Sequence, residues 1–369
     1  MNVAVFFGGK SCEHNISVIT GMQAIKAISR KHSVVPVYID PDGVWRYGKR
    51  FSDINTYREK KATGGKQVHL SPASPYLRSR GGKKLFRIDA ALLCNHGLNG
   101  EDGSLQGLLQ LCGVPYTGSG VRASAASMDK ITMKRLFMQA GLPVLPFVCF
   151  TREKYKRRMF EITEEIKSTL RFPMIVKPSN LGSSIGISIA HDFEQLFAAI
   201  DVALNWDDRI LVENALEDFT ELNCAVLGSG EDLIASEIEQ PVGWTEFLTY
   251  DDKYTKKLKG GGRKFPAEIE PEMRDKVRAA ATEAFSALGC DGVARVDFLL
   301  KDGELYVNEI NSIPGALSNY LFSGAGGDIS FESLIDRLLD LAVSRHKSEN
   351  ALKYSYKSEF ETGGKGGKS

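Results

Sequence analysis

Residues 293–315 constrain the fold most, because they form two extended runs that a short turn joins. Asp302-Gly303 lies between the runs, and Asp-Gly between alternating apolar residues is a strong β-hairpin signal. Side chains alternate across a strand, so polar residues two positions apart share one face. If the polar faces of the two strands coincide, they form a single patch, made by Arg295, Asp297, Glu309 and Asn311.

The chemistry of this patch favours a metal site. Two carboxylates and one amide offer the hard oxygen ligands that Mg²⁺ uses, usually together with waters and nucleotide phosphates. The alternative is a solvated outer face of the hairpin. It is the weaker interpretation, because the other face is apolar and the chain then turns abruptly through Pro314-Gly315.

The composition is that of a soluble globular protein with more than one domain. The chain has 369 residues, of which 43% are hydrophobic and 25% charged, and this length predicts two or three domains. A formal net charge of +1 gives no reason to expect a nucleic-acid or anionic-membrane partner. No apolar run approaches the length that spans a bilayer, and a strand is expected at the start rather than a signal peptide. Six scattered cysteines without a Cys-x-x-Cys pair indicate a reducing cytoplasm.

Strands and helices alternate over residues 1 to 120, which predicts a parallel sheet with ligands at the carboxyl ends of its strands. The expected strands are 3–7, 33–39 and 90–94, and the expected helices are 17–30 and 104–112. Residues 48–84 are rich in Lys, Arg, Gly and Ser, and we expect them to leave the core as a solvated excursion.

Two loops follow strands of this sheet. Residues 8–17 contain Gly8-Gly9, which lets the backbone approach a ligand, and Glu13. Glu13 is either a helix-start carboxylate matched to the helix dipole or a carboxylate that binds a substrate ammonium. Residues 96–103 place His96 among three glycines and two acids, a setting that favours a binding site at least as much as a structural histidine.

A helix is expected over residues 124–139, with Asp129 as a candidate N-cap. Lys130 would then lie in the first turn, which is unfavourable for a cation unless it faces an anion. Residues 151–170 predict a strongly charged surface helix.

Residues 172–188 form a second candidate site, in which Lys177 ends a buried strand and a loop of small residues follows. Such a loop can lay backbone N–H groups and the hydroxyls of Ser183 and Ser184 against a triphosphate, with Lys177 adding a point charge. The segment does not match Gly-x-x-x-x-Gly-Lys-Ser/Thr, so a P-loop is not indicated. An ordinary hairpin turn is the weaker alternative.

Three further features lie outside the two sites. Glu213 ends an expected strand and could face an adenine edge, and Glu221 precedes another and could accept from ribose hydroxyls, although either alone is typical of a surface acid. The irregular residues 243–265 carry aromatics and Lys253-Tyr254, which favour a lid over a ligand. Helices at 271–288 and 330–342 and a polar, disordered tail are expected to complete the chain.

In this order, the motifs resemble those of the ATP-grasp ligases, and specifically the D-alanine–D-alanine ligase family. The resemblance rests on Gly8-Gly-Lys-Ser-Cys-Glu-His-Asn-Ile-Ser17, His96-Gly-Leu-Asn-Gly-Glu-Asp-Gly103, Tyr116-Thr-Gly-Ser-Gly120 with Met128-Asp-Lys130, Val176-Lys-Pro-Ser179 with Gly182-Ser-Ser184, Asp252-Lys-Tyr254, Arg295-Val-Asp297 and Glu309-Ile-Asn-Ser-Ile-Pro-Gly315. Each motif alone is modest, but seven in this order are highly specific.

The resemblance implies an α/β and α+β architecture, in which a Rossmann-like N-terminal domain precedes a two-part ATP-grasp fold. On that basis the N-terminal domain would be residues 1–122 and the small central subdomain residues 123–212. The large C-terminal subdomain would be residues 213–345 with its lid at 243–265, followed by the tail at 346–369.

It also implies the ligation of two D-alanines to D-alanyl-D-alanine for peptidoglycan precursor synthesis. Family members transfer the ATP γ-phosphoryl group to the first D-amino acid, and the amine of the second attacks the acylphosphate. ATP would be the co-substrate, and two Mg²⁺ or Mn²⁺ ions would neutralise phosphoryl charge. A cytoplasmic homodimer is the usual assembly.

The resemblance assigns roles to individual residues. Asp297, Glu309 and Asn311 would hold the metal ions. ATP would contact Lys130, Lys177, Ser183, Ser184, Glu213, Glu221, Lys253 and Asn308. Glu13, Ser183, Tyr254, Arg295 and Gly315 would be catalytic, with Arg295 and the backbone N–H of Gly315 stabilising the tetrahedral intermediate. The amino-acid substrates would lie against Glu13, His96, Arg295, Gly315, Ser318 and Tyr320.

The chain departs from the family after Pro314-Gly315. Members that join two D-alanines carry a small hydroxyl residue at the position that falls on Tyr320, where it helps hold the carboxylate of the second substrate. A phenol could still donate a hydrogen bond, or Ser318 or Asn319 could serve instead. D-serine, D-lactate or another D-amino acid is therefore an alternative second substrate. A non-catalytic ATP-binding sensor is an alternative of a different class, which the intact set of catalytic residues disfavours.

Overall fold

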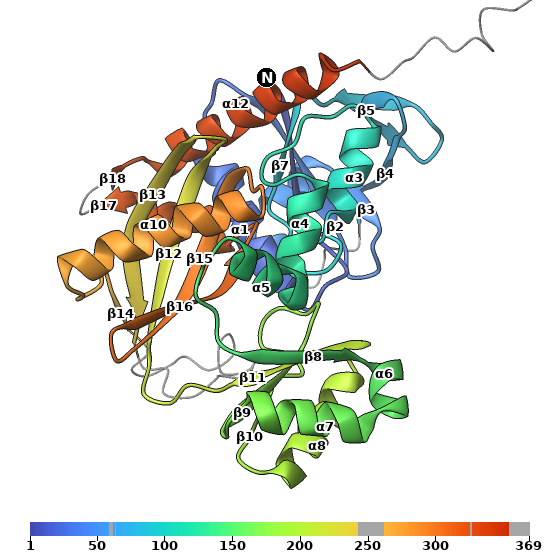
Figure 1. Ribbon diagram of the computed structural model, residues 1–369. Coiled ribbons are helices and arrows are strands. Elements are labelled where there is room, and N and C mark those ends of the chain that lie inside the picture. Colours follow the sequence, from blue (N-terminus) through green and yellow to red (C-terminus); the bar gives the residue numbers. More distant parts are fainter. Residues whose placement is uncertain (59–61, 63, 243–261, 325–326, 354–369) are drawn as a thin grey trace, which may run out of the picture.

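The computed structural model describes residues 1–58, 62, 64–242, 262–324 and 327–353. Three large sheets organise these residues. Two of them, the N-terminal and the C-terminal sheet, lie together in the main body, and the central sheet lies at one end of the molecule (Figure 1).

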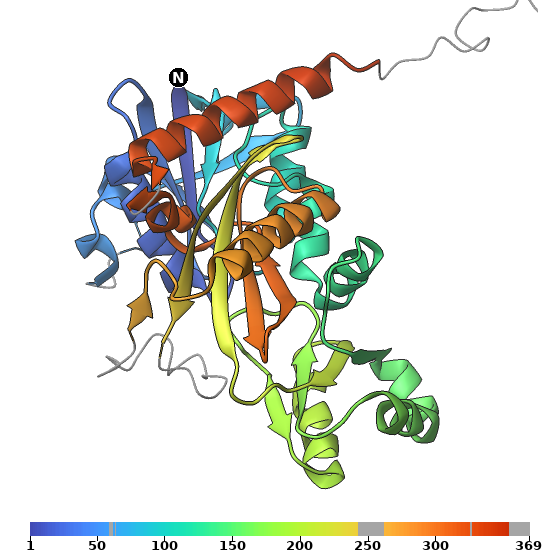
Figure 2. The same cartoon turned by 60° about the vertical axis from the view of Figure 1, so that its left-hand side comes forward.

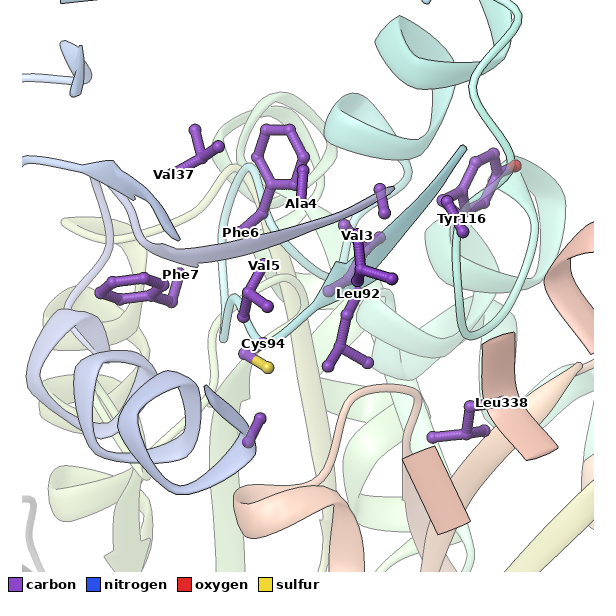
Figure 3. Close-up of a cluster of buried hydrophobic side chains, with 14 of the residues drawn as sticks. Val3, Ala4, Val5, Phe6, Phe7, Val37, Leu92, Cys94, Tyr116 and Leu338 are labelled. Carbon is purple, nitrogen blue, oxygen red and sulfur yellow. The ribbon is translucent and has the colours of Figure 1, made fainter. Parts of the chain in front are cut away.

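The N-terminal sheet has seven strands in the order β6-β5-β4-β3-β2-β1-β7. They are β1 (Asn2–Gly8), β2 (Ser33–Ile39), β3 (Trp45–Tyr47), β4 (Lys66–Ser71), β5 (Ser74–Ser79), β6 (Lys84–Arg87) and β7 (Ala90–Leu93). Strand β1 pairs in parallel with β2 and β7, which confirms the predicted parallel core, and α1 (His14–Ala27) and α3 (Ser104–Leu111) follow β1 and β7. Strand β1 is apolar on both faces because both faces are covered; Figure 3 shows Val3, Val5, Phe6 and Phe7 in the buried cluster.

The prediction that residues 48–84 leave the core was wrong. This segment forms η1 (Lys49–Ser52), α2 (Asn55–Arg58), β4 and β5, and the strands from β3 to β6 extend the sheet in antiparallel pairs. Val68 and Leu70 on β4 are buried while the residues between and before them are exposed. A two-residue alternation therefore exists, but it is short and stands in a segment whose overall composition is polar.

The central sheet has four antiparallel strands in the order β10-β9-β11-β8. They are β8 (Phe147–Thr151), β9 (Met174–Pro178), β10 (Ser188–Ala190) and β11 (Arg209–Asn214), and they pack with α6 (Arg152–Arg157), α7 (Met159–Thr169) and α8 (Phe193–Leu204) around a core of their own. The single helix predicted over residues 151–170 was wrong, because β8 takes its first residue and Arg158, at φ −138°, separates α6 from α7. Figure 2 shows this unit projecting from the body.

The helix predicted over residues 124–139 is also two helices, α4 (Val121–Met128) and α5 (Lys130–Gln139). Asp129 between them has an extended backbone and caps α5, because its carboxylate accepts a hydrogen bond from the Thr132 N–H. The N-cap prediction is confirmed, whereas the continuous helix was wrong. The break turns the first residues of α5 toward the central unit, where the Lys130 N–H donates to the Ser179 carbonyl over 2.9 Å.

The C-terminal sheet has five antiparallel strands in the order β14-β13-β12-β15-β16. They are β12 (Thr220–Ser229), β13 (Asp232–Pro241), β14 (Arg263–Lys264), β15 (Gly292–Lys301) and β16 (Glu304–Asn311). One face is covered by α10 (Pro271–Ala287) together with α4 and α5, and it buries Cys224, Val226, Val296 and Phe298 in a second core. This face is the apolar side that the hairpin pattern predicted.

The opposite face of this sheet changes character along its strands. Leu227 and Ala225 on β12 and Val293 on β15 belong to the core that the sheet shares with the N-terminal domain. Further along the same face stand Asn223 on β12 and Asp297 on β15, both buried and polar. One face therefore holds the two domains together at one end and lines a polar site at the other.

The last elements bring the chain back to the N-terminal sheet. They are η2 (Gly315–Ser318), α11 (Asn319–Phe322), β17 (Ser323–Gly324), β18 (Gly327–Asp328) and α12 (Phe331–Asn350). Helix α12 starts where it is predicted but continues well beyond residue 342, because Arg345 donates to the carbonyls of Tyr116 and Gly118 and holds its last turns. No helix in the described part of the chain is long and apolar enough to cross a membrane.

The division of the chain at residues 122 and 212 stays a prediction. Helices α4 and α5 pack into the core of the C-terminal sheet, and β11 lies in the central sheet as far as Asn214. The expected lid at 243–265 falls almost entirely outside the described residues. The expected tail at 346–369 starts too early, because α12 continues to Asn350, and from residue 354 onward it lies outside the described residues.

Replacing Leu338 by alanine tests the packing of α12. Leu338 is 1% exposed and packs in the shared core (Figure 3), so Leu338→Ala should lower the free energy of unfolding by about 2–5 kcal/mol. Leu111→Ala is the matched control, because Leu111 is 69% exposed and its loss should cost less than about 0.5 kcal/mol. Urea denaturation of both variants gives the comparison, and equal midpoints would contradict this account of α12.

Candidate active site

The hairpin formed by β15 and β16 brings its two polar faces together, as predicted. Arg295 stands directly opposite Asn311, and Asp297 stands directly opposite Glu309. The pairing shifts by one residue next to Asp297, so that Asn308 is the extra residue of a β-bulge. The bulge keeps both the polar pair and the following apolar pairs in register.

The polar patch continues across the sheet as a row of four side chains. Glu239 on β13 pairs with Asn223 on β12, Asn223 pairs with Asp297, and Asp297 pairs with Glu309. In the orientation that satisfies its hydrogen bonds, the Asn223 amide donates to Asp297 Oδ1 over 3.2 Å. Asp297 and Glu309 thus lie on adjacent strands about 5 Å apart, and Asn223 on β12 separates Asp297 from the third carboxylate, Glu239.

Arg295 balances the central carboxylate of this row. Its guanidinium binds Asp297 through both oxygens, with Nε and Nη2 at 2.6 and 2.7 Å. Burial disfavours the charged guanidinium, but pairing with Asp297 raises the pKa of Arg295 well above its usual value. The arginine is therefore a fixed positive charge at the centre of the patch.

The oxygen donors of the patch fit a Mg²⁺ or Mn²⁺ ion. Asp297 contributes a carboxylate whose partners here include Arg295, the Asn223 amide and, over 3.0 Å, the Asn311 amide. Glu309 stands opposite and adds a second carboxylate. Among the residues described, no three His, Cys, Asp or Glu side chains are grouped to hold a metal, so an amide such as that of Asn311 must contribute.

Lys130 links this patch to the central unit. Its Nζ lies 3.5 Å from Glu309 Oε2 and donates to the Leu181 carbonyl over 2.9 Å. Leu181 belongs to the small-residue loop after β9, in which Ser183 and Ser184 both have left-handed backbones at φ 53° and 58°. The predicted anion partner of a first-turn lysine is thus a carboxylate in this structure.

The same loop reaches the N-terminal domain through Glu13. The Ser183 hydroxyl donates a short hydrogen bond to Glu13 Oε1. Glu13 is the N-cap residue of α1, but its side chain makes no capping hydrogen bond. Gly182 lies so close that a Cβ there would stand 2.9 Å from Glu13 Oε2.

All three parts of the chain line one small cavity of about 60 Å³. Its lining includes Glu13, Glu101, Lys130, Ser183, Glu309 and Asn311. A wider cavity of about 340 Å³ adjoins it at Glu13 and is lined by Lys10, Gly97 and Leu181 among others. Residues far apart in sequence therefore meet at the place where the carboxyl end of β1 faces the C-terminal hairpin.

His96 and Glu101 connect the N-terminal loop to the turn after β16. His96 Nε2 lies 2.8 Å from the Thr20 hydroxyl, and the oxygen of that hydroxyl accepts from the Ala316 N–H at 3.2 Å. Burial lowers the pKa of His96 to about 4. Glu101, which sequence reasoning did not single out, accepts from the N–H groups of Gly97 and Ile313, and burial and the Glu13 charge raise its pKa to about 8.

A second charged group lies between the central unit and α5. Glu213 on β11 pairs with Lys177 on β9 and, over 2.7 Å, with Lys134 on α5, and all three are buried. Burial alone would raise the pKa of Glu213, but the two lysines lower it to about 2. Sequence reasoning missed Lys134, although it follows Lys130 by four residues and so shares its helix face.

The segment after Gly315 places Tyr320 against β13. The Tyr320 hydroxyl donates to Glu239 Oε2 over 2.9 Å, and the Arg263 guanidinium stacks 4.5 Å from the centre of the Tyr320 ring. Ser318 is fully buried, and Asn319 donates to the Ala316 carbonyl. Glu221 lies opposite Leu299 on the face of the polar row, whereas Lys253 and Tyr254 lie outside the described residues.

Two family models match the chain. The model described as "D-ala D-ala ligase N-terminus" matches residues 2–119, and the one described as "D-ala D-ala ligase C-terminus" matches residues 136–340. The chain belongs to the D-alanine–D-alanine ligase family. Membership makes it an ATP-dependent ligase and confirms the family resemblance and fold class that the motifs predicted.

Relatives match over nearly their whole length. The D-alanine–D-alanine ligase of Chloroherpeton thalassium is 40% identical over 95% of this chain and 98% of that protein, and D-alanine–D-alanine ligase A of Escherichia coli K12 is 38% identical over 96% and 98%. Among solved structures, the VanG D-Ala:D-Ser ligase of Enterococcus faecalis has a TM-score of 0.79 at 30% identity over 93% of this chain and all of that one. The Coxiella burnetii D-alanine–D-alanine ligase shares the fold, with a TM-score of 0.81 at 24% identity over 95% and 96%.

The low pKa of His96 in this ligase predicts a specific acid sensitivity. The folded state binds the His96 proton near pH 4 and an unfolded histidine binds it near 6.5, so stability is fully present above 6.5 and falls as the pH drops toward 4. The loss should approach about 1.4 kcal/mol per pH unit below pH 6. Thermal unfolding from pH 7.5 to 5 should show a shallower decline for His96→Gln than for the wild type, and parallel curves would contradict this.

Proposed function

We propose that this ligase joins two D-alanines to D-alanyl-D-alanine with consumption of ATP, for peptidoglycan precursor synthesis. The observation that carries the proposal is the register of the hairpin, which places Asp297 opposite Glu309 and Arg295 opposite Asn311 beside Lys130. Carboxylates for metal ions, a fixed guanidinium and a lysine at one cavity are the groups that phosphoryl transfer to a carboxylate requires.

The first D-alanine would bind with its ammonium at Glu13, which Ser183 orients. Its carboxylate oxygen attacks the γ-phosphorus of ATP, so that ADP leaves and an acylphosphate forms. The neutral amine of the second D-alanine attacks the carbonyl carbon, and the C–O bond to phosphate breaks. Arg295 and the Gly315 N–H would stabilise the oxyanion of this tetrahedral intermediate, because preorganised donors act where charge develops.

The remaining predicted residues would bind ATP. Lys177 and Lys130 would contact phosphates, together with the loop that carries Ser183 and Ser184. Glu213, Glu221 and Asn308 would contact the rest of the nucleotide. Lys253 and Tyr254 would act from the lid. These roles are part of the proposal.

Asp297, Glu309 and Asn311 would hold two Mg²⁺ or Mn²⁺ ions, which supply charge neutralisation for phosphoryl transfer when bound. We also propose a cytoplasmic homodimer, because the family resemblance implies one. Light scattering of the purified chain would test the assembly, and a monomer at all concentrations would contradict it.

One observation keeps a different acceptor open. The hydroxyl of Tyr320 is directed to Glu239, so the group that replaces a small hydroxyl residue does not offer its proton to a substrate in this structure. D-serine, D-lactate or another D-amino acid as the second substrate is therefore the alternative function. The ATP and metal residues would act in the same way for any of them.

Phosphate release with ATP and Mg²⁺ tests the proposal, using D-alanine alone, D-alanine with D-serine, and D-alanine with D-lactate, with products identified by mass. We expect turnover with D-alanine alone and at least about a hundredfold loss of kcat in Glu309→Gln, which removes a metal carboxylate. Glu304→Gln, an exposed position at the start of the same strand, should retain activity. Turnover only with a mixed pair would establish the alternative, and ATP binding without any turnover would contradict both readings.

Replacing Gly182 by alanine tests the contact between the loop and Glu13. The added Cβ would stand 2.9 Å from Glu13 Oε2, so the carboxylate or the loop must move away. Because small displacements of positioning groups are costly, kcat/KM for D-alanine should fall by about ten- to a hundredfold. Gly81→Ala, where nothing lies within 4 Å of the added Cβ, is the control, and unchanged kinetics in both variants would remove Glu13 from the site.

A further inference from the structure

Three side chains form a cluster at the β13–β14 edge of the C-terminal sheet. The Tyr320 hydroxyl donates to Glu239 Oε2 over 2.9 Å, Arg263 Nη1 lies 3.5 Å from Glu239 Oε1, and the Arg263 guanidinium lies 4.5 Å from the centre of the Tyr320 ring. Glu239 is nearly buried, with 8% of its side chain exposed, whereas 53% of the Arg263 side chain is exposed. We call these residues the edge cluster.

The edge cluster occupies one end of the polar row. Glu239 stands at the β13 end of the row and Glu309 at the β16 end, with Asp297 between them. Lys130 and the loop from the central unit meet the row at Glu309. The phosphate side of the site is therefore the β16 side, and the edge cluster lies on the opposite side of Arg295.

Tyr320 also lies close to the guanidinium of Arg295. Burial has the largest effect on the phenol and raises the pKa of Tyr320 to about 12. The charge of Arg295 lowers this pKa, and the charge of Asp297 raises it. The phenol is thus protonated at neutral pH. Its one hydrogen is donated to Glu239, so its hydroxyl offers a ligand only an acceptor.

Arg263, in contrast to the Tyr320 hydroxyl, can offer a ligand hydrogen-bond donors. A guanidinium carries five N–H donors, and its contacts with Glu239 and the Tyr320 ring leave most of them unused among the described residues. Stacking on the ring and pairing with a nearly buried carboxylate hold its plane without neutralising its exposed edge. Such an edge suits the two-pronged binding of a carboxylate.

We propose that Arg263 binds the carboxylate of the second substrate, a proposal that rests on the proposed ligation of two amino acids. The second amine must reach the carbonyl carbon beside Arg295, and in any α-amino acid the carboxylate carbon lies about 2.5 Å from that amine. With the phosphate on the β16 side, the second substrate extends toward the edge cluster. Tyr320 and Glu239 are positioning residues, and the arginine takes over the anchoring that a small hydroxyl residue gives other family members.

Competition between two acceptors tests the proposal. D-Alaninamide has the amine of D-alanine but a neutral amide in place of the carboxylate, so it can be the second substrate but has no carboxylate to phosphorylate as the first. With both compounds present, the ratio of D-alanyl-D-alanine to D-alanyl-D-alaninamide, measured by mass, gives the ratio of their kcat/KM values. That ratio does not depend on the folded fraction of a variant or on binding of the first substrate.

The expected result is a wild-type preference for D-alanine that Arg263→Met lowers by about ten- to a hundredfold, as loss of charged hydrogen bonds should. Arg263→Lys should restore part of the preference, because it keeps the charge without the planar fork. Tyr320→Phe should leave most of the preference intact, because the ring that supports Arg263 remains. Arg278→Met is the matched control, since Arg278 pairs with Glu237 from the α10 side of the sheet.

The outcomes separate this proposal from the proposed function. A wild-type enzyme that forms D-alanyl-D-alanine, with an unchanged product ratio in Arg263→Met, overturns only the role of Arg263. Loss of the preference in Tyr320→Phe but not in Arg263→Met also overturns it, because the phenol would then be the anchor. If the wild type accepts only D-serine or another amino acid, the competition uses that amino acid and its amide. An unchanged product ratio in Arg263→Met then overturns the role of Arg263, and a lowered preference for the carboxylate supports it. A wild type that ligates no acceptor overturns both proposals.

Discussion

The pairing of Arg295 with Asp297 is the interaction on which the site depends. The row holds three carboxylates on one sheet face, and Asp297 and Glu309 among them lie on adjacent strands, where like charges repel. Each of the three has a cation: Glu239 has Arg263, Asp297 has Arg295, and Glu309 has Lys130. The central pair is bidentate, with Asp297 buried and Arg295 half-buried, and both residues lie on one strand two positions apart. Removing one partner of such a pair leaves an uncompensated buried charge, which is strongly destabilising. Each carboxylate of the row therefore lies beside a cation.

The same sheet face both joins the domains and carries the site, so its register is doubly constrained. A slip of one residue in β15 would turn Val293, Arg295 and Asp297 together to the α10 side, because alternate residues point to opposite faces. The core shared with the N-terminal domain would lose Val293, and the apolar core under α10 would receive two charged groups. The bulge at Asn308 shows how the chain manages this constraint. It absorbs one residue of β16, so that Glu309 stands opposite Asp297 while Val307 returns to the apolar side. One register of β15 and β16 therefore places Val307 in the apolar core and Glu309 beside Asp297.

The sequence predicted the parts of the fold and site that local patterns specify. The Asp-Gly turn and the period of two in residues 293–311 predicted the hairpin and the meeting of its polar faces, and the cap at Asp129 was predicted correctly. What local patterns could not supply are contacts between distant segments. Glu239 and Arg263 look like ordinary charged residues until the sheet order places them beside Tyr320. Helix breaks at Asp129 and Arg158 also depend on tertiary packing, since nothing in the flanking residues forbids a continuous helix.

Helix α5 determines how the phosphate side and the metal side of the cavity meet. Its apolar residues Met133 and Phe137 pack in the core of the C-terminal sheet, so the helix moves with that sheet. Its two lysines reach the other way, Lys134 to Glu213 on β11 and Lys130 to the Leu181 carbonyl in the loop after β9. Because the Lys134–Glu213 contact is buried, a rotation of the central unit away from α5 would leave buried charges without a partner in a low-dielectric interior. The lysines one turn apart therefore fix the distance between the loop that would hold phosphates and the carboxylates that would hold metal ions.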